Sequence, residues 1–208
     1  RGDLGIEIPP ADVPAVQHGI ITKCNKAYKP VIIATQMLDS MTTHPRPTRA
    51  EVSDVAVAIV EGSDCVMLSG ETAAGKYPLQ SVQMMAEICQ KVEMEIEPRN
   101  TYQSDNDDRD VSDATGFAAV QTARRVNAKA LLCPTISGYT ARIMSSFKPR
   151  LPIIAASPDT NTLRRCAFYW GVEGIETEER SNFNAICKDA LDTANNLNLL
   201  EEGDIVVI

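Results

Sequence analysis

Short apolar runs alternate with amphipathic helical segments along most of this chain, and this alternation limits the folds that it can adopt. Residues 30–34 (Pro-Val-Ile-Ile-Ala) and 65–68 (Cys-Val-Met-Leu) are continuous apolar runs. Such runs are typical of strands that are covered on both faces. Between them, apolar residues recur at helical spacing from 52 to 60. The pattern predicts an α/β fold with parallel strands.

The helix between these two strands carries its own start and stop signals. Thr48 and Glu51 have the spacing of a capping box, in which each side chain bonds the other's backbone N–H. Gly62 fits the end of the helix. A further helix is expected from near Leu79. Its predicted inward face consists of Val82, Met85, Ala86, Cys89, Val92 and Ile96.

An acidic segment separates the two halves of the chain. Residues 98–110 contain one apolar side chain, that of Tyr102, and have the composition of a linker. We therefore expect two domains, at 1–97 and 111–208. In the second, strands are expected at 130–133, 152–156, 171–174 and 204–208, with helices before and between them, as in an open, doubly wound α/β domain. The predicted inward residues of its first helix are Ala114, Phe117, Ala118, Thr122 and Ala123.

Charge and cysteine content bear on partners and location. The formal net charge of −8 and the pI of about 4.8 argue against a dedicated nucleic-acid surface and against binding to an anionic membrane. The six cysteines are scattered, with no C-x-x-C pair, which favours buried free thiols over a zinc or disulfide framework. With no signal-peptide pattern in the sequence, we expect a cytoplasmic protein without nucleic-acid or membrane partners.

Small and polar residues follow three of the predicted strand ends. These are Arg1-Gly2-Asp3-Leu4-Gly5, Ala34-Thr35-Gln36-Met37 and Ser69-Gly70-Glu71-Thr72. In barrels of parallel strands, catalytic groups gather at such ends. A glycine beside an aspartate lets backbone N–H groups approach an anion while the carboxylate holds a hard cation.

Plainer interpretations of the same residues remain open. Asp3 could cap a following helix, Thr35 could bond its own backbone, and Ser69 could belong to a simple turn. Residues 1–3 also spell the Arg-Gly-Asp tripeptide of cell-adhesion ligands, a short match that no secretory signal supports.

Four longer runs carry a resemblance to a known family. RGDLGIEIP (1–9), KPVIIATQMLDSM (29–41), PRPTRAEVSDVA (45–56) and DCVMLSGETAAGKYP (64–78) resemble the C-terminal half of the pyruvate kinase barrel, and residues 111–208 resemble that family's C-terminal regulatory domain. The resemblance implies an α/β chain made of the C-terminal part of a TIM (β/α)8 barrel followed by an open α/β domain. It also implies phosphoryl transfer from phosphoenolpyruvate to ADP in glycolysis, giving pyruvate and ATP, with Mg²⁺ (or Mn²⁺) and K⁺ as cofactors.

The resemblance implies roles for individual residues. Asp3 would bind the divalent metal, and the N–H groups of Gly2 and Asp3 would receive the carboxylate of phosphoenolpyruvate. Thr35 would contact the same carboxylate and, with Ser69, act in proton delivery through water, because a threonine hydroxyl is a poor acid by itself. Glu71 would support the site. Arg46 and Arg49 would serve a contact between subunits of a homo-oligomer, which is a tetramer in this family.

The loop after the first strand of the second domain is a candidate effector site. Hydroxyls, a glycine and a helix start meet in Cys133-Pro-Thr-Ile-Ser-Gly-Tyr-Thr-Ala-Arg142, which suits a phosphate group. By resemblance, the phosphate of an effector would lie on Thr135, Ser137, Gly138, Tyr139 and Thr140. The alternative is an ordinary Ser/Thr helix cap.

The resemblance also implies what lies outside this sequence. The family's first barrel strands, with the catalytic lysine, the second metal carboxylate, the K⁺ ligands and the nucleotide-binding arginine, have no counterpart here, nor does the lid domain. The second domain is expected to stop after its penultimate strand. We therefore expect no turnover from these 208 residues alone. A non-catalytic regulatory or interaction module with residual barrel sequence is the alternative, and a lyase acting on a related substrate is a weaker one.

Overall fold

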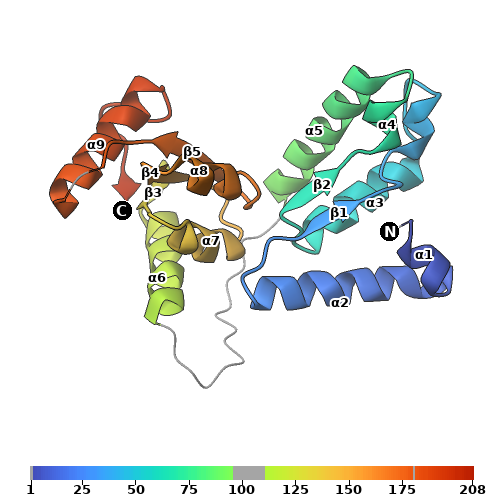
Figure 1. Cartoon of the computed structure of the whole chain (residues 1–208), viewed down its shortest axis with the longest axis horizontal. Helices are drawn as coiled ribbons and strands as arrows, with labels where there is room; N and C mark the ends of the chain where they lie inside the picture. Colours follow the sequence, from blue (N-terminus) through green and yellow to red (C-terminus); the bar gives the residue numbers. More distant parts are fainter. Residues whose placement is uncertain (1, 96–110, 180) are drawn as a thin grey trace. The chain divides into compact units, whose positions relative to one another are not determined.

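The computed structural model describes residues 2–95, 111–179 and 181–208. The chain divides into two compact units, Arg1–Glu97 and Pro98–Ile208, and each has its own parallel sheet (Figure 1). The acidic linker expected at residues 98–110 lies outside the described residues.

The first unit is built around a pair of parallel strands. In chain order it contains α1 (Leu4–Glu7), a 3₁₀ turn (Pro10–Asp12), α2 (Val13–Lys26), β1 (Ile32–Ala34), a second 3₁₀ turn (Asp39–Thr42), α3 (Arg49–Val60), β2 (Cys65–Met67), α4 (Gly70–Ala73) and α5 (Pro78–Glu95). β1 and β2 pair with Ile32 beside Cys65 and Ala34 beside Met67. Since α3 joins two parallel strands, the strand–helix–strand unit expected from the sequence is confirmed.

Local signals set the ends of α3 as expected. The Thr48 Oγ1 accepts from the Glu51 N–H at 3.3 Å, and the Glu51 carboxylate accepts from the Thr48 N–H at 2.7 Å, so the capping box is present. Gly62 follows the helix with φ of 97°, a left-handed conformation that favours glycine.

The predicted inward face of α5 is partly wrong. Val82 is 51% exposed and Ala86 is exposed, whereas Ser81 and Ile88, which were not predicted to face inward, are buried. Met85 is buried as predicted, Cys89 and Val92 are half-buried, and Ile96 lies outside the described residues. The Ser81 hydroxyl donates to the carbonyl of Tyr77 in the preceding turn at 2.8 Å. Because this bond satisfies the hydroxyl within the helix, a polar residue can occupy the buried face that the apolar pattern assigns to Val82.

The second unit is an open α/β domain with a four-stranded, all-parallel sheet. Its elements are α6 (Val111–Arg125), β3 (Ala130–Pro134), α7 (Tyr139–Ser146), β4 (Ile153–Ser157), α8 (Thr160–Cys166), β5 (Val172–Glu176), α9 (Phe183–Asn196) and β6 (Val206–Val207). The strand order is β5-β4-β3-β6, so the chain moves outward from β3 to β5 and then returns to the other side of β3. The expected open α/β architecture is confirmed.

Helices cover both faces of this sheet. On one face, strand residues such as Leu132 and Ile154 pack against Ala190 and Ala194 of α9. On the other, Gly174 of β5 lies against Leu163 of α8. Right-handed crossovers explain the division, because α8 accompanies the outward path of the chain and α9 its return.

The inward face predicted for α6 is also partly wrong. Ala114, Ala118 and Thr122 are exposed, whereas the buried residues of this helix are Asp113, Gly116, Val120 and Ala123. Gly116 lies so close to α7 that an added Cβ would be 2.7 Å from the Ile143 side chain. Close approach of the two helices at a glycine therefore sets the buried face, rather than the largest apolar side chains.

Candidate active site

Parallel pairing brings two of the predicted strand ends to one edge of the first unit. Ala34 ends β1 beside Met67, which ends β2, so the segments that begin at Thr35 and at Leu68 leave the sheet side by side. This is the arrangement that places functional groups of different strands together in parallel barrels.

Thr35 connects this edge to the beginning of the chain. Its Oγ1 accepts a hydrogen bond from the Gly2 N–H at 2.8 Å, across 33 positions of sequence. Thr35 and Gln36 both have positive φ, of 67° and 53°. Two successive non-glycine residues in the left-handed region are uncommon and cost free energy, so tertiary contacts must hold this turn. The Thr35 side chain bonds a distant segment, which argues against the plainer interpretation that it only closes its own strand.

Glu71 ties together the loops that follow the two strands. Its side chain is 2% exposed, and its two carboxylate oxygens accept from the Leu38 N–H at 3.0 Å and from the Ser69 N–H at 2.8 Å. Hydrogen bonds to an ionised acceptor are the stronger kind. Glu71 therefore fixes Ser69, in the loop after β2, relative to the loop that carries Thr35.

Ser69 presents a buried hydroxyl that the surrounding protein does not use. Its Oγ has no hydrogen-bond partner within the described part of the chain, and it makes no capping bond to α4 although it occupies the N-cap position. Buried polar atoms are normally paired, so an unpaired hydroxyl next to a strand end marks a candidate functional group.

Asp3 lies at the start of α1 but does not cap it. Its backbone is helical (φ −66°, ψ −39°), its side chain makes no capping hydrogen bond, and the residue is exposed. The capping interpretation is therefore not supported. A carboxylate is a suitable oxygen ligand for Mg²⁺, which binds few protein carboxylates and keeps several other oxygen ligands. Among residues 2–95, 111–179 and 181–208, no cluster of three or more His, Cys, Asp or Glu residues could enclose a metal.

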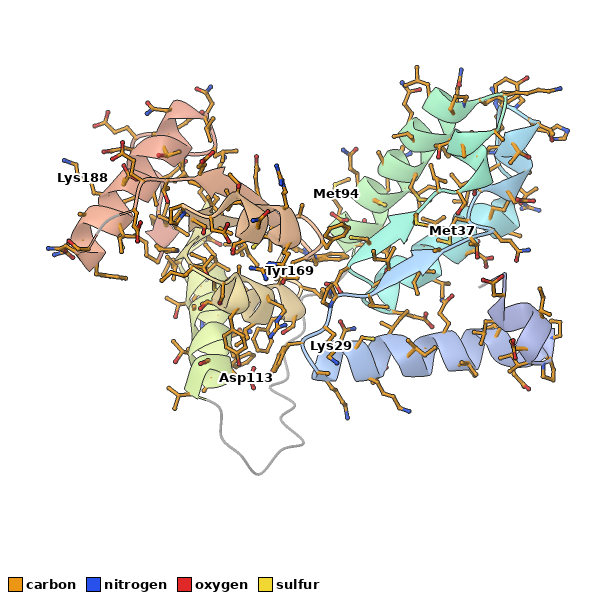
Figure 2. All side chains as sticks on the ribbon, viewed as in Figure 1. Lys29, Met37, Met94, Asp113, Tyr169 and Lys188 are labelled. Atoms are coloured by element: carbon orange, nitrogen blue, oxygen red, sulfur yellow. The ribbon has the colours of Figure 1, made fainter. Side chains whose placement is uncertain are left out.

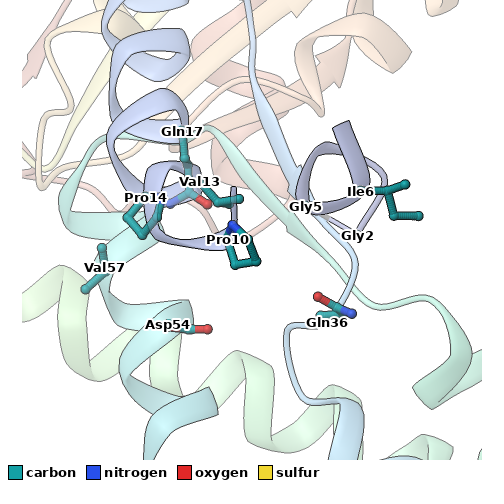
Figure 3. Close-up of a pocket in the computed structure, with 10 residues that line it drawn as sticks. All are labelled: Gly2, Gly5, Ile6, Pro10, Val13, Pro14, Gln17, Gln36, Asp54 and Val57. Atoms are coloured by element: carbon teal, nitrogen blue, oxygen red, sulfur yellow. The ribbon is translucent and has the colours of Figure 1, made fainter. Parts of the chain in front are cut away.

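A cavity of about 440 Å³ opens beside Gly2 and Gln36, and Asp3, Thr35, Ser69 and Glu71 are not among its lining residues (Figure 3). Gly2 and Gln36 line it next to the Thr35 turn, and Asp54 and Val57 line it from α3. The remaining lining residues are Gly5, Ile6, Pro10, Val13, Pro14 and Gln17. Sequence reasoning placed Gln36 after a strand end without giving it a role, and it missed Gln17 and Asp54, because only the spatial approach of α2 and α3 brings these two residues to the cavity.

Arg46 and Arg49 are not part of this cluster. Both residues are exposed, and within the described ranges neither has a hydrogen bond or ion pair to Gly2, Asp3, Thr35 or Ser69. Arg49 is the first residue of α3.

In the second unit, the candidate effector loop is held by its own hydroxyls. Gly138 has φ of 77° at the N-cap of α7, and its N–H donates to Thr135 Oγ1 at 2.9 Å. The Tyr139 N–H donates more weakly to Ser137 Oγ at 3.4 Å. Ser137, Tyr139 and Thr140 are exposed. The loop therefore offers N–H groups and hydroxyls at a helix start, but Thr135 and Ser137 already accept two of the N–H groups.

Two family models match this chain. The model described as pyruvate kinase, barrel domain, matches residues 1–82, and the model described as pyruvate kinase, alpha/beta domain, matches residues 113–208. The two matches fall on the two compact units and in this order. The chain belongs to the pyruvate kinase family.

Individual pyruvate kinases match over the whole chain. One from Sporosarcina psychrophila is 45% identical and one from Geobacillus stearothermophilus is 44% identical, each over 210 residues that cover all of this chain and 36% of the relative. A crystal structure of a pyruvate kinase from Cryptosporidium parvum has a TM-score of 0.88 at 38% identity, and the match covers 99% of this chain and 42% of that one. The chain thus spans 36% of the length of these curated relatives.

Family membership confirms the fold expected from the sequence, a C-terminal part of a barrel followed by an α/β domain. Pyruvate kinases are glycolytic phosphotransferases that generally use Mg²⁺ and K⁺. No helix within the described ranges is long and apolar enough to cross a membrane.

Proposed function

We propose that this chain is the C-terminal part of an enzyme that transfers a phosphoryl group from phosphoenolpyruvate to ADP, giving pyruvate and ATP. The observation that carries the proposal is the hydrogen bond from the Gly2 N–H to Thr35 Oγ1, at 2.8 Å, next to the Glu71 clamp on Ser69. With the bond from the Leu38 N–H to Glu71, these contacts tie Gly2 and the loop after β2 to the segment that follows β1. The chain supplies one side of a site, so we expect no turnover from it alone.

In this proposal the carboxylate of phosphoenolpyruvate binds between Gly2, Asp3 and Thr35. The Gly2 N–H now donates to the threonine oxygen. An arriving carboxylate is a stronger acceptor than a neutral hydroxyl, so it would take over this N–H and accept from the Thr35 O–H as well. Binding would therefore use donors that the free protein already holds in position.

The second part of the proposal concerns the proton. Loss of the phosphoryl group leaves an enolate, which becomes pyruvate when its terminal carbon gains a proton. Thr35 would orient the water that delivers this proton, since a threonine hydroxyl is too weak an acid to act directly at neutral pH. The buried hydroxyl of Ser69, which has no partner within the described part of the chain, would extend the relay.

Asp3 would hold the divalent metal, Mg²⁺ or Mn²⁺. The donor set fits one shared carboxylate ligand and not a complete metal shell, because Asp3 is exposed and the described ranges hold no larger acidic cluster around it. When bound, the metal neutralises charge on the transferred phosphoryl group. K⁺ belongs to the proposal only through the family, and we assign none of the described residues to it.

We also propose that the loop at 135–140 binds the phosphate of an effector. A phosphate oxygen would replace the Thr135 and Ser137 hydroxyls as acceptor for the N–H groups of Gly138 and Tyr139. The freed hydroxyls could then donate to the same phosphate, as could the exposed hydroxyl of Thr140.

Assembly and location complete the proposal. Arg46 and Arg49 are exposed at the start of α3, where they would contact another subunit of a homo-oligomer, a tetramer in this family. We place the protein in the cytoplasm, because all six cysteines are free thiols, as is usual in a reducing compartment.

The proposal is tested by comparing the parent protein that contains these residues with its Thr35→Val and Thr35→Ser variants. Pyruvate formation from phosphoenolpyruvate and ADP is followed through lactate dehydrogenase, and proton delivery is followed separately by exchange of the pyruvate methyl hydrogens with solvent deuterium. We expect Thr35→Val to slow both by about 10²-fold, the lower range for a lost proton-transfer group, and Thr35→Ser to recover most of the rate. Thr43→Val removes an exposed hydroxyl with local bonds and serves as the control.

Two outcomes would overturn the proposal. A parent protein that forms no pyruvate would remove the function itself. Normal methyl exchange in the Thr35→Val enzyme would refute the role of Thr35 in proton delivery, and Thr35 would then be at most a binding group. Turnover by the isolated 208-residue chain would contradict the expectation that it holds only part of the site.

A further inference from the structure

Two buried cysteines lie beneath the loop at 135–140 and have no role in the function proposed above. Cys133 is 3% exposed and Cys166 is fully buried, and both are free thiols. The other four cysteines are only partly buried.

Strand register places Cys133 on the face of the sheet that α8 covers. Cys133 of β3 pairs with Ala155 of β4, which pairs with Gly174 of β5. These three residues form one row across the sheet, and their side-chain positions share a face. An added Cβ on Gly174 would lie 3.2 Å from Leu163 of α8, so this row faces α8.

Cys166 belongs to the buried side of the same helix. It is the last residue of α8, one turn after Thr162, and both are fully buried. Residues four apart lie on one face of a helix, so the side chains of Cys166 and Thr162 point to the same side of α8. Each contacts the loop: an added Cβ on Gly138 would be 3.0 Å from the Cys166 Sγ, and Thr162 Oγ1 donates to the Ile136 carbonyl at 2.8 Å.

We propose that Cys133 and Cys166 are a covalent modification site, a dithiol that a peroxide oxidises to an intramolecular disulfide under the loop. One thiolate attacks the peroxide, which breaks the O–O bond and leaves a sulfenic acid and water or an alcohol. The second thiol then attacks the sulfenic sulfur, forming the S–S bond and releasing water. The two thiols lose two hydrogens and two electrons, and the peroxide is reduced.

The surroundings keep the pair reduced under ordinary conditions. Burial, and to a smaller degree the neighbouring Cys166, raise the pKa of the Cys133 thiol to about 12. The reactive species is the thiolate, so reaction is slow at neutral pH until the loop moves. Gly138 lies over the Cys166 sulfur and has no side chain, and Ile136 in the same loop is 85% exposed. A local displacement of this loop would therefore be enough to admit a small peroxide to the thiols.

The disulfide would change the loop above it. A disulfide bond to Cys133 of β3 would move the Cys166 sulfur. This sulfur now packs closely under Gly138, where an added Cβ would lie 3.0 Å from it. The contact of Thr162 with Ile136 lies one helical turn away and would change with it. Formation of the bond does not depend on phosphate binding by the loop, so the two proposals can fail separately.

The test uses the intact chain treated with hydrogen peroxide, then alkylated and digested for peptide mass mapping. We expect a cross-linked peptide pair containing Cys133 and Cys166, with the loss of two hydrogens, which dithiothreitol reverses. Amide exchange in residues 136–140 should become about tenfold faster, as expected when one hydrogen bond such as that from Thr162 to Ile136 is lost. The Cys89→Ala chain should behave like the parent, and the Cys166→Ala chain should leave Cys133 alkylated.

Peptide mapping of the parent chain tests the proposal even if one of the variants folds poorly. Recovery of both cysteines as alkylated thiols, with oxidation confined to the partly buried cysteines, would overturn the proposal. A cross-link that leaves exchange in residues 136–140 unchanged would uphold the covalent site and refute its effect on the loop.

Discussion

Replacing Glu71 with glutamine should loosen both loops of the candidate active site while leaving the side-chain volume nearly unchanged. Glu71 is buried in α4, and each of its carboxylate oxygens accepts one backbone N–H, from Leu38 at 3.0 Å and from Ser69 at 2.8 Å. Glutamine keeps one acceptor oxygen and turns an NH₂ group toward the other N–H. Two donors then face each other in a buried place.

The size of the effect follows from these two bonds. A hydrogen bond to a charged acceptor contributes about 1.5–3 kcal/mol, and a buried donor left unpaired costs about 1–3 kcal/mol. One of the two bonds is lost in Glu71→Gln, so we expect a local destabilisation of about 2–3 kcal/mol. At about 1.4 kcal/mol per factor of ten, this predicts amide exchange that is roughly 30- to 150-fold faster in the two loops.

Hydrogen–deuterium exchange at the Leu38 and Ser69 amides measures this directly. Glu87→Gln is the matched control, because Glu87 is exposed and, among the described residues, pairs with Lys91 alone, one turn along α5. This type of contact contributes at most about 0.5 kcal/mol. If both loops exchange no faster in Glu71→Gln than in Glu87→Gln, the carboxylate does not hold the site together and the reasoning is refuted.

Three further predictions concern stability. Burial raises the pKa of Glu51, but its hydrogen bonds from Ser40 and Thr48 together outweigh burial and lower it. The contribution of these hydrogen bonds to the free energy of unfolding is therefore present above pH 4.5, the ordinary pKa of a glutamate, and is lost as the pH falls below it. Glu51→Gln should remove this pH dependence from the unfolding curves. Gly116→Ala should destabilise by about 1–3 kcal/mol, since the new Cβ would lie 2.7 Å from an isoleucine of α7. Gly19→Ala, in helix α2 with nothing within 4 Å of the added Cβ, should instead stabilise by about 0.5–1 kcal/mol. Denaturant midpoints test both, and a Gly116→Ala midpoint at or above that of the parent, or a Gly19→Ala midpoint below it, would contradict the corresponding prediction.

The order of strands and helices could be predicted because its signals are local. The apolar runs became β1 and β2, and the T-x-x-E spacing of Thr48 and Glu51 became a capping box with both bonds formed. Buried helix faces were predicted less well. In α6 the face is set by the approach of α7 at Gly116, and nothing in a single helix sequence indicates which neighbour will come closest.

The candidate site was also predicted only in part. The general rule for parallel strands was enough to select the ends at Thr35 and Ser69. The contacts that hold them could not be predicted, because the Gly2–Thr35 and Leu38–Glu71 bonds each join residues 33 positions apart. The resemblance implied a supporting role for Glu71, but the residue type alone does not indicate that its carboxylate is buried and accepts from two loops.

The backbone at Thr35 shows why these distant contacts matter for the function proposed. Left-handed backbone at a non-glycine residue costs about 1–2 kcal/mol, and Thr35 and Gln36 both adopt it, with φ of 67° and 53°. Nothing in these two residue types favours such a turn, so contacts with the rest of the unit must stabilise it, among them the bonds at Gly2 and at Glu71. A turn stabilised from outside can present the threonine hydroxyl in one fixed direction. Positioning of the proposed proton relay is therefore a property of the whole edge of the unit rather than of Thr35 itself.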